Sequence, residues 1–400
     1  MELIERVADE DNLREAFSRV RARKGAPGID GRSIAAYQAD LDRNLSELSR
    51  LLSQGRYQPP PVRRVYIPKP SGGERPLGIP TVADRVAQQA VLQVIYPLFE
   101  GTFRDCSYAF RVGRSPHDAV RKVEEYLSGN HWVVDADISD FFGSVDHSIL
   151  LYDVSRVIKD RKVFLLIKRW LKSGVMEEGE IRYAMTGTPQ GGVISPLLAN
   201  VYLTRLDKVM EENGLKMVRY ADDFVIFCRR RWQARFILEL VEKVMVKLRL
   251  ELHPEKTKVV NGHRDGFTFL GYRFIRGYKS PRPESVDAFR DKVRHVTRRQ
   301  QPKKLEMVIA DLNPIIRGWG NYYKHGDTKT LFRSLDKWIR MRLRCFLEKK
   351  RAHYHQNQRL PNYLFVRAGL VSLSDLKLAL APCDGATVKD SRIRENRTCG

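Results

Sequence analysis

Two short apolar segments of this chain carry aspartates, and together they constrain the fold more than any other feature of the sequence. Residues 131–138 are typical of a buried strand, and aspartates stand at positions 135 and 137. Residues 217–220 and 224–227 are typical of a β-hairpin whose tip is Ala221-Asp222-Asp223. Because strands and helices mix here without a strict βαβ alternation, we expect an α+β fold with helices packed on an antiparallel sheet.

Other elements follow from apolar spacing and turn residues. Apolar residues at helical spacing predict helices over 13–20, 91–98, 198–206 and 237–248. The third of these is expected to begin with Ser195 as its N-cap and Pro196 in its first turn. Residues 66–69 and 75–80 flank a Ser-Gly-Gly turn and predict a second β-hairpin.

The chain is strongly basic, and the excess charge is concentrated. Its 400 residues include 71 Lys and Arg against 48 Asp and Glu, a formal net charge of +23. Residues 287–360 are patterned as helices and carry more than half of this excess. Such a surplus predicts a polyanionic partner, either nucleic acid or an acidic membrane surface. No basic amphipathic segment with large exposed apolar residues is evident, so we expect nucleic acid and no membrane.

Cellular location is indicated by what the sequence carries at its start and by its cysteines. The first residues are charged, and no apolar run approaches the roughly 20 residues of a membrane span. The five cysteines are scattered without a C-x-x-C pair, which predicts reduced thiols. We therefore expect a cytoplasmic protein.

Three carboxylates from two neighbouring strands form a set that can hold two Mg²⁺ ions about 4 Å apart. Such ions activate an attacking 3′-hydroxyl and stabilise a leaving pyrophosphate. The aspartates of the hairpin alone are weak evidence, because Asp is a common turn residue. The second acidic strand strengthens the hypothesis. Spacing does not choose between Asp135 and Asp137, since a period of two places both on one face.

The sequence resembles the reverse transcriptases encoded by bacterial group II introns, in which a polymerase is joined to a maturase (thumb, or X) domain. Eight stretches stand in the family order: residues 28–31, 67–69 with 75–80, 107–115, 135–138, 188–196, 220–223, 253–258 and 269–272. The resemblance implies a right-hand polymerase. It places fingers and palm over 1–276, a helical thumb or maturase domain over 285–365 and a short C-terminal tail over 366–400, with 277–284 as a linker.

The resemblance also implies a catalytic and metal-binding triad of Asp137, Asp222 and Asp223, with the carbonyl of Ile138 as an additional ligand. Two Mg²⁺ ions are the implied cofactor, with Mn²⁺ as a substitute. The implied substrates are an RNA template, a DNA primer and deoxynucleoside triphosphates. Phe142 matches a steric gate that excludes the ribose 2′-hydroxyl, and Phe141 takes this role if the register is off by one.

Further contacts to the nucleotide are implied by the motifs. Lys69 and Arg75 match residues that contact the triphosphate, and Arg suits a bidentate phosphate contact. Gln190 matches a residue that lies against nucleotide and template. Lys256 matches a lysine near the triphosphate that protonates the pyrophosphate, although Lys258 is close enough to be confused with it.

Primer and nucleic-acid contacts complete the assignment. Phe269, Leu270, Gly271 and Tyr272 resemble the primer grip, with a plain buried strand end as the alternative. In the maturase-like part, aromatic and basic residues are interleaved, a combination that stacks on bases and neutralises phosphates. The residues that we expect to bind nucleic acid are Arg317, Trp319, Tyr322, Tyr323, Arg340 and Arg344.

These features predict an RNA-directed DNA polymerase that also binds its parent group II intron RNA to assist splicing and retrohoming. Family members often carry Lys-Gly where this chain has Ser139-Asp140, and Asp where it has Gly143. These departures leave open a host role in DNA repair or phage defence. A third hypothesis is a splicing cofactor with a vestigial polymerase. We expect the C-terminal endonuclease domain of some relatives to be absent.

Overall fold

The computed structural model describes residues 2–68, 72–177, 180–182, 187, 191–349 and 359–378. It divides the chain into two compact units, Met1–Leu270 and Gly271–Gly400. The predicted α+β composition is confirmed, because sheets of mainly antiparallel strands mix with helices in the first unit and helices dominate the second.

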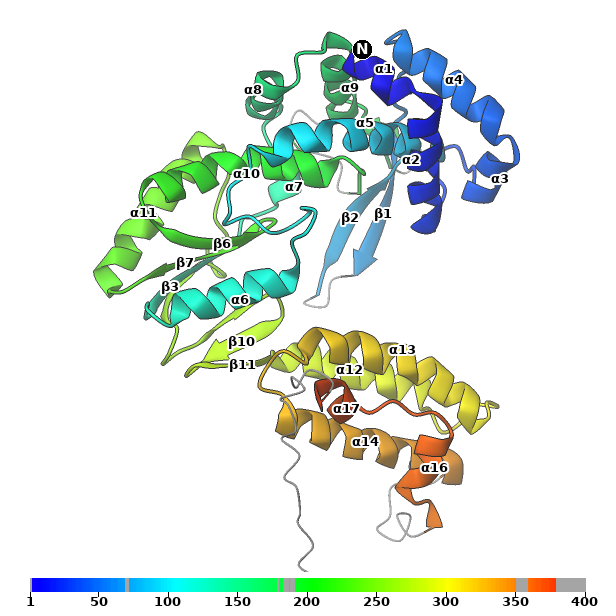
Figure 1. Ribbon diagram of the computed structural model, residues 1–400, viewed down its shortest axis with the longest axis vertical. Helices are drawn as coiled ribbons and strands as arrows, with labels where there is room; N and C mark the ends of the chain where they lie inside the picture. The colour runs from blue at the N-terminus through cyan, green and yellow to red at the C-terminus, as the bar shows by residue number, and fades with distance from the viewer. Residues whose placement is uncertain are drawn as a thin grey trace, which may run out of the picture. The chain divides into compact units, whose positions relative to one another are not determined.

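The first unit begins with helices that pack around one long helix. α2 packs on α5, and α1 packs on α4 (Figure 1). α5 is buried on most sides, which explains its apolar sequence. The helices predicted over 13–20 and 91–98 are confirmed. The bounds are α1 Leu3–Ala8, α2 Glu10–Ala22, α3 Ile34–Ala39, α4 Leu41–Ser53 and α5 Val82–Glu100.

The predicted hairpin is present as β1, Val62–Pro68, and β2, Glu74–Ile79. The two strands are antiparallel, and Ile67 pairs with Arg75. Two short strands, β4 (Val175–Glu177) and β5 (Glu180–Arg182), extend this sheet to the order β2-β1-β4-β5.

A second, four-stranded sheet has the order β6-β7-β3-β8 and is antiparallel throughout. Helices α6, α10 and α11 pack against its strands. The residues of its two central strands are nearly all buried, so carboxylates at the ends of these strands are unusual. The bounds are β3 Trp132–Ala136, β6 Lys216–Tyr220, β7 Asp223–Cys228, β8 Lys258–Asn261, α6 Pro116–Leu127, α10 Ser195–Glu212 and α11 Arg231–Lys247.

The start of α10 corrects one expectation. Ile194, not Ser195, is the N-cap, and it already has helical dihedral angles of φ −84 and ψ −20. The carbonyl of Ile194 accepts the first helical hydrogen bonds, so Ser195 lies inside the helix. Pro196 does lie in the first turn.

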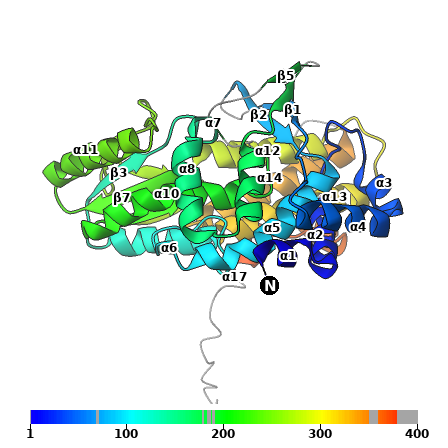
Figure 2. The same cartoon turned by 90° about the horizontal axis from the view of Figure 1, so that it is seen from above.

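Three further helices and one strand complete the first unit. α8 packs against both α9 and α10. Figure 2 shows α8 crossing α10. Asp146 caps α8 by accepting the backbone N–H groups of Ser148 and Ile149. The bounds are α7 Phe141–Ser144, α8 His147–Val157, α9 Arg161–Leu171 and β9 Phe267–Phe269.

The second unit begins earlier than the boundary predicted at 276. The segment expected to be a linker instead forms β11, Tyr278–Pro281, which pairs with β10, Tyr272–Ile275. This hairpin belongs with the helices that follow, because Tyr272 packs on Tyr322 and Tyr323. The helical bounds are α12 Pro283–Val296, α13 Leu305–Tyr323, α14 Lys329–Glu348, α16 Asn362–Arg367 and α17 Leu373–Leu378.

Residues 366–378 are not a tail, contrary to our expectation. Leu373 is fully buried. The carboxylate of Asp336 accepts hydrogen bonds from the backbone N–H groups of Leu373 and Ser374, at 2.8 and 3.0 Å, and from the hydroxyls of Ser372 and Ser374. The helical unit therefore extends to Leu378 at least.

Candidate functional site

The turn between β6 and β7 presents two of the three predicted carboxylates. Tyr220 pairs with Asp223 across the hairpin, so Ala221 and Asp222 form a two-residue loop. Ala221 has φ 59, a left-handed conformation that is unfavourable for any residue except glycine. This strained residue directly precedes Asp222, and strained backbone of this kind is common at functional sites.

Asp137 lies one residue beyond the end of β3, next to the hairpin turn. β3 and β7 are antiparallel, with Ala136 opposite Phe224, so Asp137 reaches the level of Asp223. Burial, a hydrogen bond with Asp137 and the charges of the neighbouring aspartates raise the pKa of Asp223 to about 7. The charges of Asp137 and Asp222 therefore both act on Asp223.

Asp135 lies on the same strand but inside the ladder. It is opposite Val225 on one side and Lys258 on the other. Burial raises the pKa of Asp135 to about 7, opposed by the charge of Lys258. Asp137, at the open end of the strand, has freer access to a ligand than Asp135.

Lys256 and Asp137 form an ion pair in which Nζ lies 2.6 Å from Oδ2. The backbone carbonyl of Asp137 also accepts the N–H of His253 at 2.8 Å. Ile138 is buried and forms a β-bridge with Leu252. The 252–256 segment therefore holds the end of β3 in place by its backbone and by one charge.

Carboxylate oxygens are the ligands that Mg²⁺ prefers. The donor chemistry of the triad fits this ion, and the pairing of Ala136 with Phe224 places Asp137 beside Asp223. Within the described ranges, however, no three acidic, histidine or cysteine side chains are already grouped closely enough to hold a metal ion. A divalent ion would need to draw the three carboxylates closer together.

Arg75 lies on β2 with an exposed side chain. Burial, together with the charge of Asp137, raises the pKa of Asp222, and the positive charges of Arg75 and Lys256 oppose this rise. Arg75 of the β1–β2 hairpin and Lys256 of the 252–256 segment therefore both act by their charge on Asp222. Lys69, predicted on the other arm, lies outside the described residues.

The two phenylalanines after β3 have different surroundings. Phe141 is buried in the core and packs edge-on against Tyr202. Phe142 is only partly buried and contacts the core from its rim. Because the ring of Phe141 is packed inside the core, Phe142 is the better candidate for the expected steric gate.

Gln190 also lies outside the described residues, but its neighbour Gly191 is described. Gly191 has φ 119, and a Cβ at this position would lie 2.4 Å from the carbonyl oxygen of Gly78. Only glycine fits here. On the far side of the segment, the side chain of Gln88 accepts the N–H of Ile194 at 3.2 Å.

The predicted primer grip joins β9 to β10. Phe269 and Tyr272 are buried, whereas Leu270 and Gly271 are half-buried and have φ values of 49 and 78. The two aromatic side chains therefore match the alternative of a buried strand end. Only Leu270 and Gly271 are available for contact with a primer.

In the second unit, several residues predicted to bind nucleic acid are structural. Trp319 stacks on Phe289 with ring centroids 4.6 Å apart, and Tyr323 is buried beside it. Arg344 is buried and donates to the carbonyl of Leu360 and to Asn362 Oδ1, both at 2.8 Å. We correct the assignment for Trp319, Tyr323 and Arg344, because the polar groups of these three side chains face the interior.

The remaining predicted contacts stay accessible. Arg317 is exposed on α13, while Tyr322 and Arg340 are half-buried. These three are the members of the predicted set that can still reach a nucleic acid.

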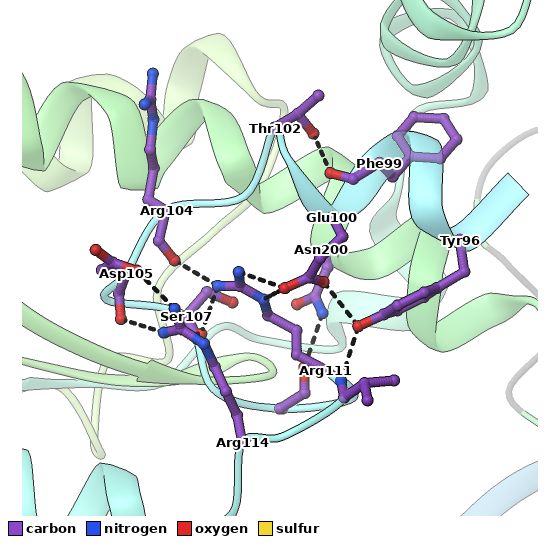
Figure 3. Close-up of polar contacts among 12 residues, drawn as sticks. Tyr96, Phe99, Glu100, Thr102, Arg104, Asp105, Ser107, Arg111, Arg114 and Asn200 are labelled. Atoms are coloured by element: carbon purple, nitrogen blue, oxygen red, sulfur yellow. Dashed lines mark hydrogen bonds and ion pairs between the residues drawn. The ribbon is translucent and has the colours of Figure 1, made fainter.

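Sequence reasoning missed a buried polar cluster behind the hairpin turn. Arg219 and Asp207 form an ion pair with both side chains fully buried. The neighbouring loop is held by Arg111, which donates to Glu100 and to the carbonyls of Arg104 and Ser107 (Figure 3). The sequence feature that could have revealed this cluster is an arginine at an apolar strand position directly before Tyr220.

Two protein-family models match this chain. A family model described as reverse transcriptase (RNA-dependent DNA polymerase) matches residues 67–274, just over half of the chain. The chain belongs to the reverse transcriptase family. A second model, the maturase-specific domain of group II introns, matches residues 286–364 of this reverse transcriptase. The predicted family and fold are thereby confirmed.

The chain is also similar to individual proteins. Protein YkfC of Escherichia coli (strain K12) is 36% identical over 316 residues, which cover 68% of this reverse transcriptase and 83% of YkfC. The group II intron-encoded protein LtrA of Lactococcus lactis subsp. cremoris is 34% identical over 238 residues, which cover 55% of this chain and 40% of LtrA. A telomerase structure from Candida albicans matches with a TM-score of 0.47 and 11% identity over 86% of this chain and 68% of that one.

None of the described helices is both long enough and apolar enough to span a membrane. The expected nucleic-acid partner fits the reverse transcriptase and maturase matches.

Proposed function

We propose that this reverse transcriptase extends a DNA primer on an RNA template at the carboxylate cluster of Asp137, Asp222 and Asp223. The observation that carries the proposal is the meeting of β3 and the β6–β7 turn, where the strand pairing places Asp137 beside Asp223. Three mutually repelling carboxylates have no structural reason to be kept together unless a cation joins them.

Two Mg²⁺ ions bound by this cluster would polarise the phosphate and lower the pKa of the attacking 3′-hydroxyl. The protein's own groups perform the remaining tasks. Arg75 is exposed on its strand and suits bidentate binding of a triphosphate oxygen pair. Phe142 is proposed to lie against C2′ of the incoming sugar, which leaves no room for a 2′-hydroxyl.

Lys256 is proposed to donate the proton that the leaving pyrophosphate needs. Its ammonium group is held 2.6 Å from Asp137 Oδ2, so it is already fixed beside the reacting centre. Its side chain is 61% exposed, which leaves it free to turn toward a bound triphosphate.

We further propose that the helical unit binds group II intron RNA and assists splicing. Support comes from the match to the maturase-specific domain and from the basic composition of residues 287–360. Arg317 and Arg340 are the exposed and half-exposed basic groups that we place at this surface.

Primer extension on an RNA template with Mg²⁺ and deoxynucleotides tests the polymerase. The wild type should extend the primer, and Asp222→Ala/Asp223→Ala should not, while RNA binding by the double variant stays intact. If neither protein extends the primer although both bind RNA, the polymerase is vestigial and the splicing cofactor becomes the better hypothesis.

The intron role needs a separate test that does not depend on polymerase activity. The Asp222→Ala/Asp223→Ala variant should bind the intron RNA that flanks its gene and accelerate its splicing. Absence of both effects, under conditions where a known maturase succeeds with its own intron, would remove the intron half of the proposal and leave the polymerase intact.

A further inference from the structure

Arg219 has every hydrogen-bond donor of its side chain occupied. Its guanidinium donates to both oxygens of Asp207, at 2.7 and 2.5 Å, and to Ser107 Oγ at 2.9 Å. The two remaining N–H groups reach Asn200 Oδ1 at 3.1 Å and the carbonyl of Ala221 at 2.9 Å. An arginine has five such donors, so none is left over.

The backbone of Arg219 is fixed as well. Its N–H donates to the carbonyl of Cys106 at 2.7 Å, and its carbonyl accepts the N–H of Tyr108 at 3.0 Å. The loop at 106–108 thereby adds a parallel bridge to the edge of β6. Arg219 cannot shift along or across the sheet without breaking several of these bonds.

The bond to Ala221 connects this framework to the catalytic turn. The carbonyl of Ala221 belongs to the same peptide group as the N–H of Asp222. Because Ala221 is held at φ 59, the turn would gain by relaxing toward negative φ. The Arg219 bond opposes that relaxation, since it fixes the orientation of the peptide that carries Asp222.

The partners of Arg219 are themselves anchored. Asn200, on α10, donates to the carbonyl of Ala109 at 2.8 Å. Arg114 donates to the carbonyls of Asp105 and Ser107, and Arg111 also reaches Ser107 (Figure 3). The turn is therefore tied through Arg219 to a rigid loop and a long helix, not to a mobile surface group.

Stability alone does not account for this arrangement. Arg219 and Asp207 are both fully buried, and the desolvation of two charges offsets much of their attraction. Apolar residues of similar volume often give equal or greater stability at such positions. An apolar pair could not, however, hold the carbonyl of Ala221.

We propose that Arg219 is a positioning residue that sets the placement of Asp222 for metal binding, by fixing the Ala221–Asp222 peptide to α10 and the 106–108 loop. The inference rests on the proposed function, because it gives Asp222 a metal to bind. Arg219 itself touches neither substrate nor metal in this scheme, and acts through the peptide alone.

The test compares Arg219→Lys with Arg205→Lys. Arg205 is also bonded through two nitrogens to an aspartate, Asp153, at 2.7 and 2.8 Å, but it lies away from the turn. A lysine at 219 keeps a positive charge for Asp207, yet it cannot also reach Ala221, Ser107 and Asn200. In a second variant, Arg219→Met/Asp207→Leu, no buried charge is left unpaired, so this variant should fold even if Arg219→Lys does not.

The first readouts are independent of catalysis. Hydrogen exchange of a peptide that contains residues 220–224 should be faster in Arg219→Lys and in the double variant than in wild type, and unchanged in Arg205→Lys. Mn²⁺ binding, measured by calorimetry on the full chain, should weaken only in the two Arg219 variants. A lack of polymerase activity in the wild type would count against the proposed function but leave these two readouts to decide the inference.

Where the wild type is active, the steady-state constants add a third readout. We expect kcat to fall about tenfold to a hundredfold in the Arg219 variants at temperatures where they are folded, with KM for the deoxynucleotide little changed. The Mg²⁺ concentration for half-maximal rate should rise. If the folded Arg219 variants instead match Arg205→Lys in exchange, Mn²⁺ binding and kcat, Arg219 is only structural and the inference is overturned.

Discussion

Lys256 holds the carboxylate of Asp137 by its side chain, while the backbone carbonyl of the same aspartate accepts the N–H of His253. One short segment thus holds both the side chain and the backbone of the residue at the end of β3. When a triphosphate brings its own negative charge, Lys256 can exchange Asp137 for the phosphate without a large movement.

Lys256→Gln should lower kcat for single-nucleotide incorporation by about a hundredfold, the usual contribution of a general acid. KM for the deoxynucleotide should change less, because the proton is needed after binding. Rapid-quench measurement of one incorporation event gives both constants. Lys258→Gln is the matched control, because Lys258 acts on Asp135 instead. An equal loss in both variants would show a general effect of positive charge near the cluster, contrary to this prediction.

Phe142→Ala should relax the discrimination against ribonucleotides, because we propose that its partly buried ring borders the space where a 2′-hydroxyl would sit. The ratio of kcat/KM for a deoxynucleotide to that for its ribonucleotide should fall. Phe141→Ala, in contrast, should cost about 3–5 kcal/mol of folding free energy and leave the ratio nearly unchanged. The assignment to Phe142 would be wrong if the Phe141 variant, still folded, lost the discrimination.

Arg317→Ala and Arg340→Ala should each weaken RNA binding uniformly across sequences. Each should also make the slope of log K against log salt shallower by about one unit if it contacts a phosphate. Binding measured by filter retention at several salt concentrations gives this slope. Arg344→Ala should behave differently, because Arg344 donates to Leu360 and Asn362 inside the unit. It should lower the melting temperature, and a reduced salt slope at a temperature where it is folded would contradict our correction.

Asp146 predicts a pH dependence of stability. Burial acts to raise the pKa of this carboxyl, but hydrogen bonds from Ser148 and Ile149 and the contact with Arg249 outweigh it and lower the pKa from 3.8 to about 2. The unfolded chain therefore takes up the proton first. The stabilisation is complete above the unfolded pKa of 3.8 and is lost as the pH falls toward about 2.

Asp146→Ala should consequently destabilise the protein by about 1–2 kcal/mol near neutral pH, where the helix cap is lost. The difference from wild type should shrink as the pH falls below 4 and nearly vanish below 2. Urea unfolding at several pH values measures it. Asp146→Asn keeps a capping oxygen and should cost less at neutral pH than Asp146→Ala. A difference that stayed constant down to pH 2 would disprove the role of the charge.

The sequence indicated the sheet and its carboxylates well, because strand periodicity and turn chemistry are local properties. Choosing Asp137 over Asp135 on physical grounds required the end of β3, which depends on partner strands 85 residues or more away. The failures have the same origin. Composition predicted a basic surface but could not tell which arginines face inward. Arg344 faces inward because Leu360 and Asn362, which follow its helix in the sequence, accept its hydrogen bonds.

Arg219 was missed for a related reason. A single arginine in an apolar strand is typical of an edge strand, and its partners at Ser107, Asn200 and Asp207 become neighbours only in the fold.

The carboxylate of Asp336 has a practical consequence for anyone who shortens this chain. The maturase-specific match ends at residue 364, yet Asp336 receives its hydrogen bonds from residues 372–374. A protein trimmed to the limits of the match would keep the buried acid and discard all of these donors, and it would also expose the pocket that Leu373 fills. The C-terminal limit for producing the helical unit therefore lies at or beyond Leu378.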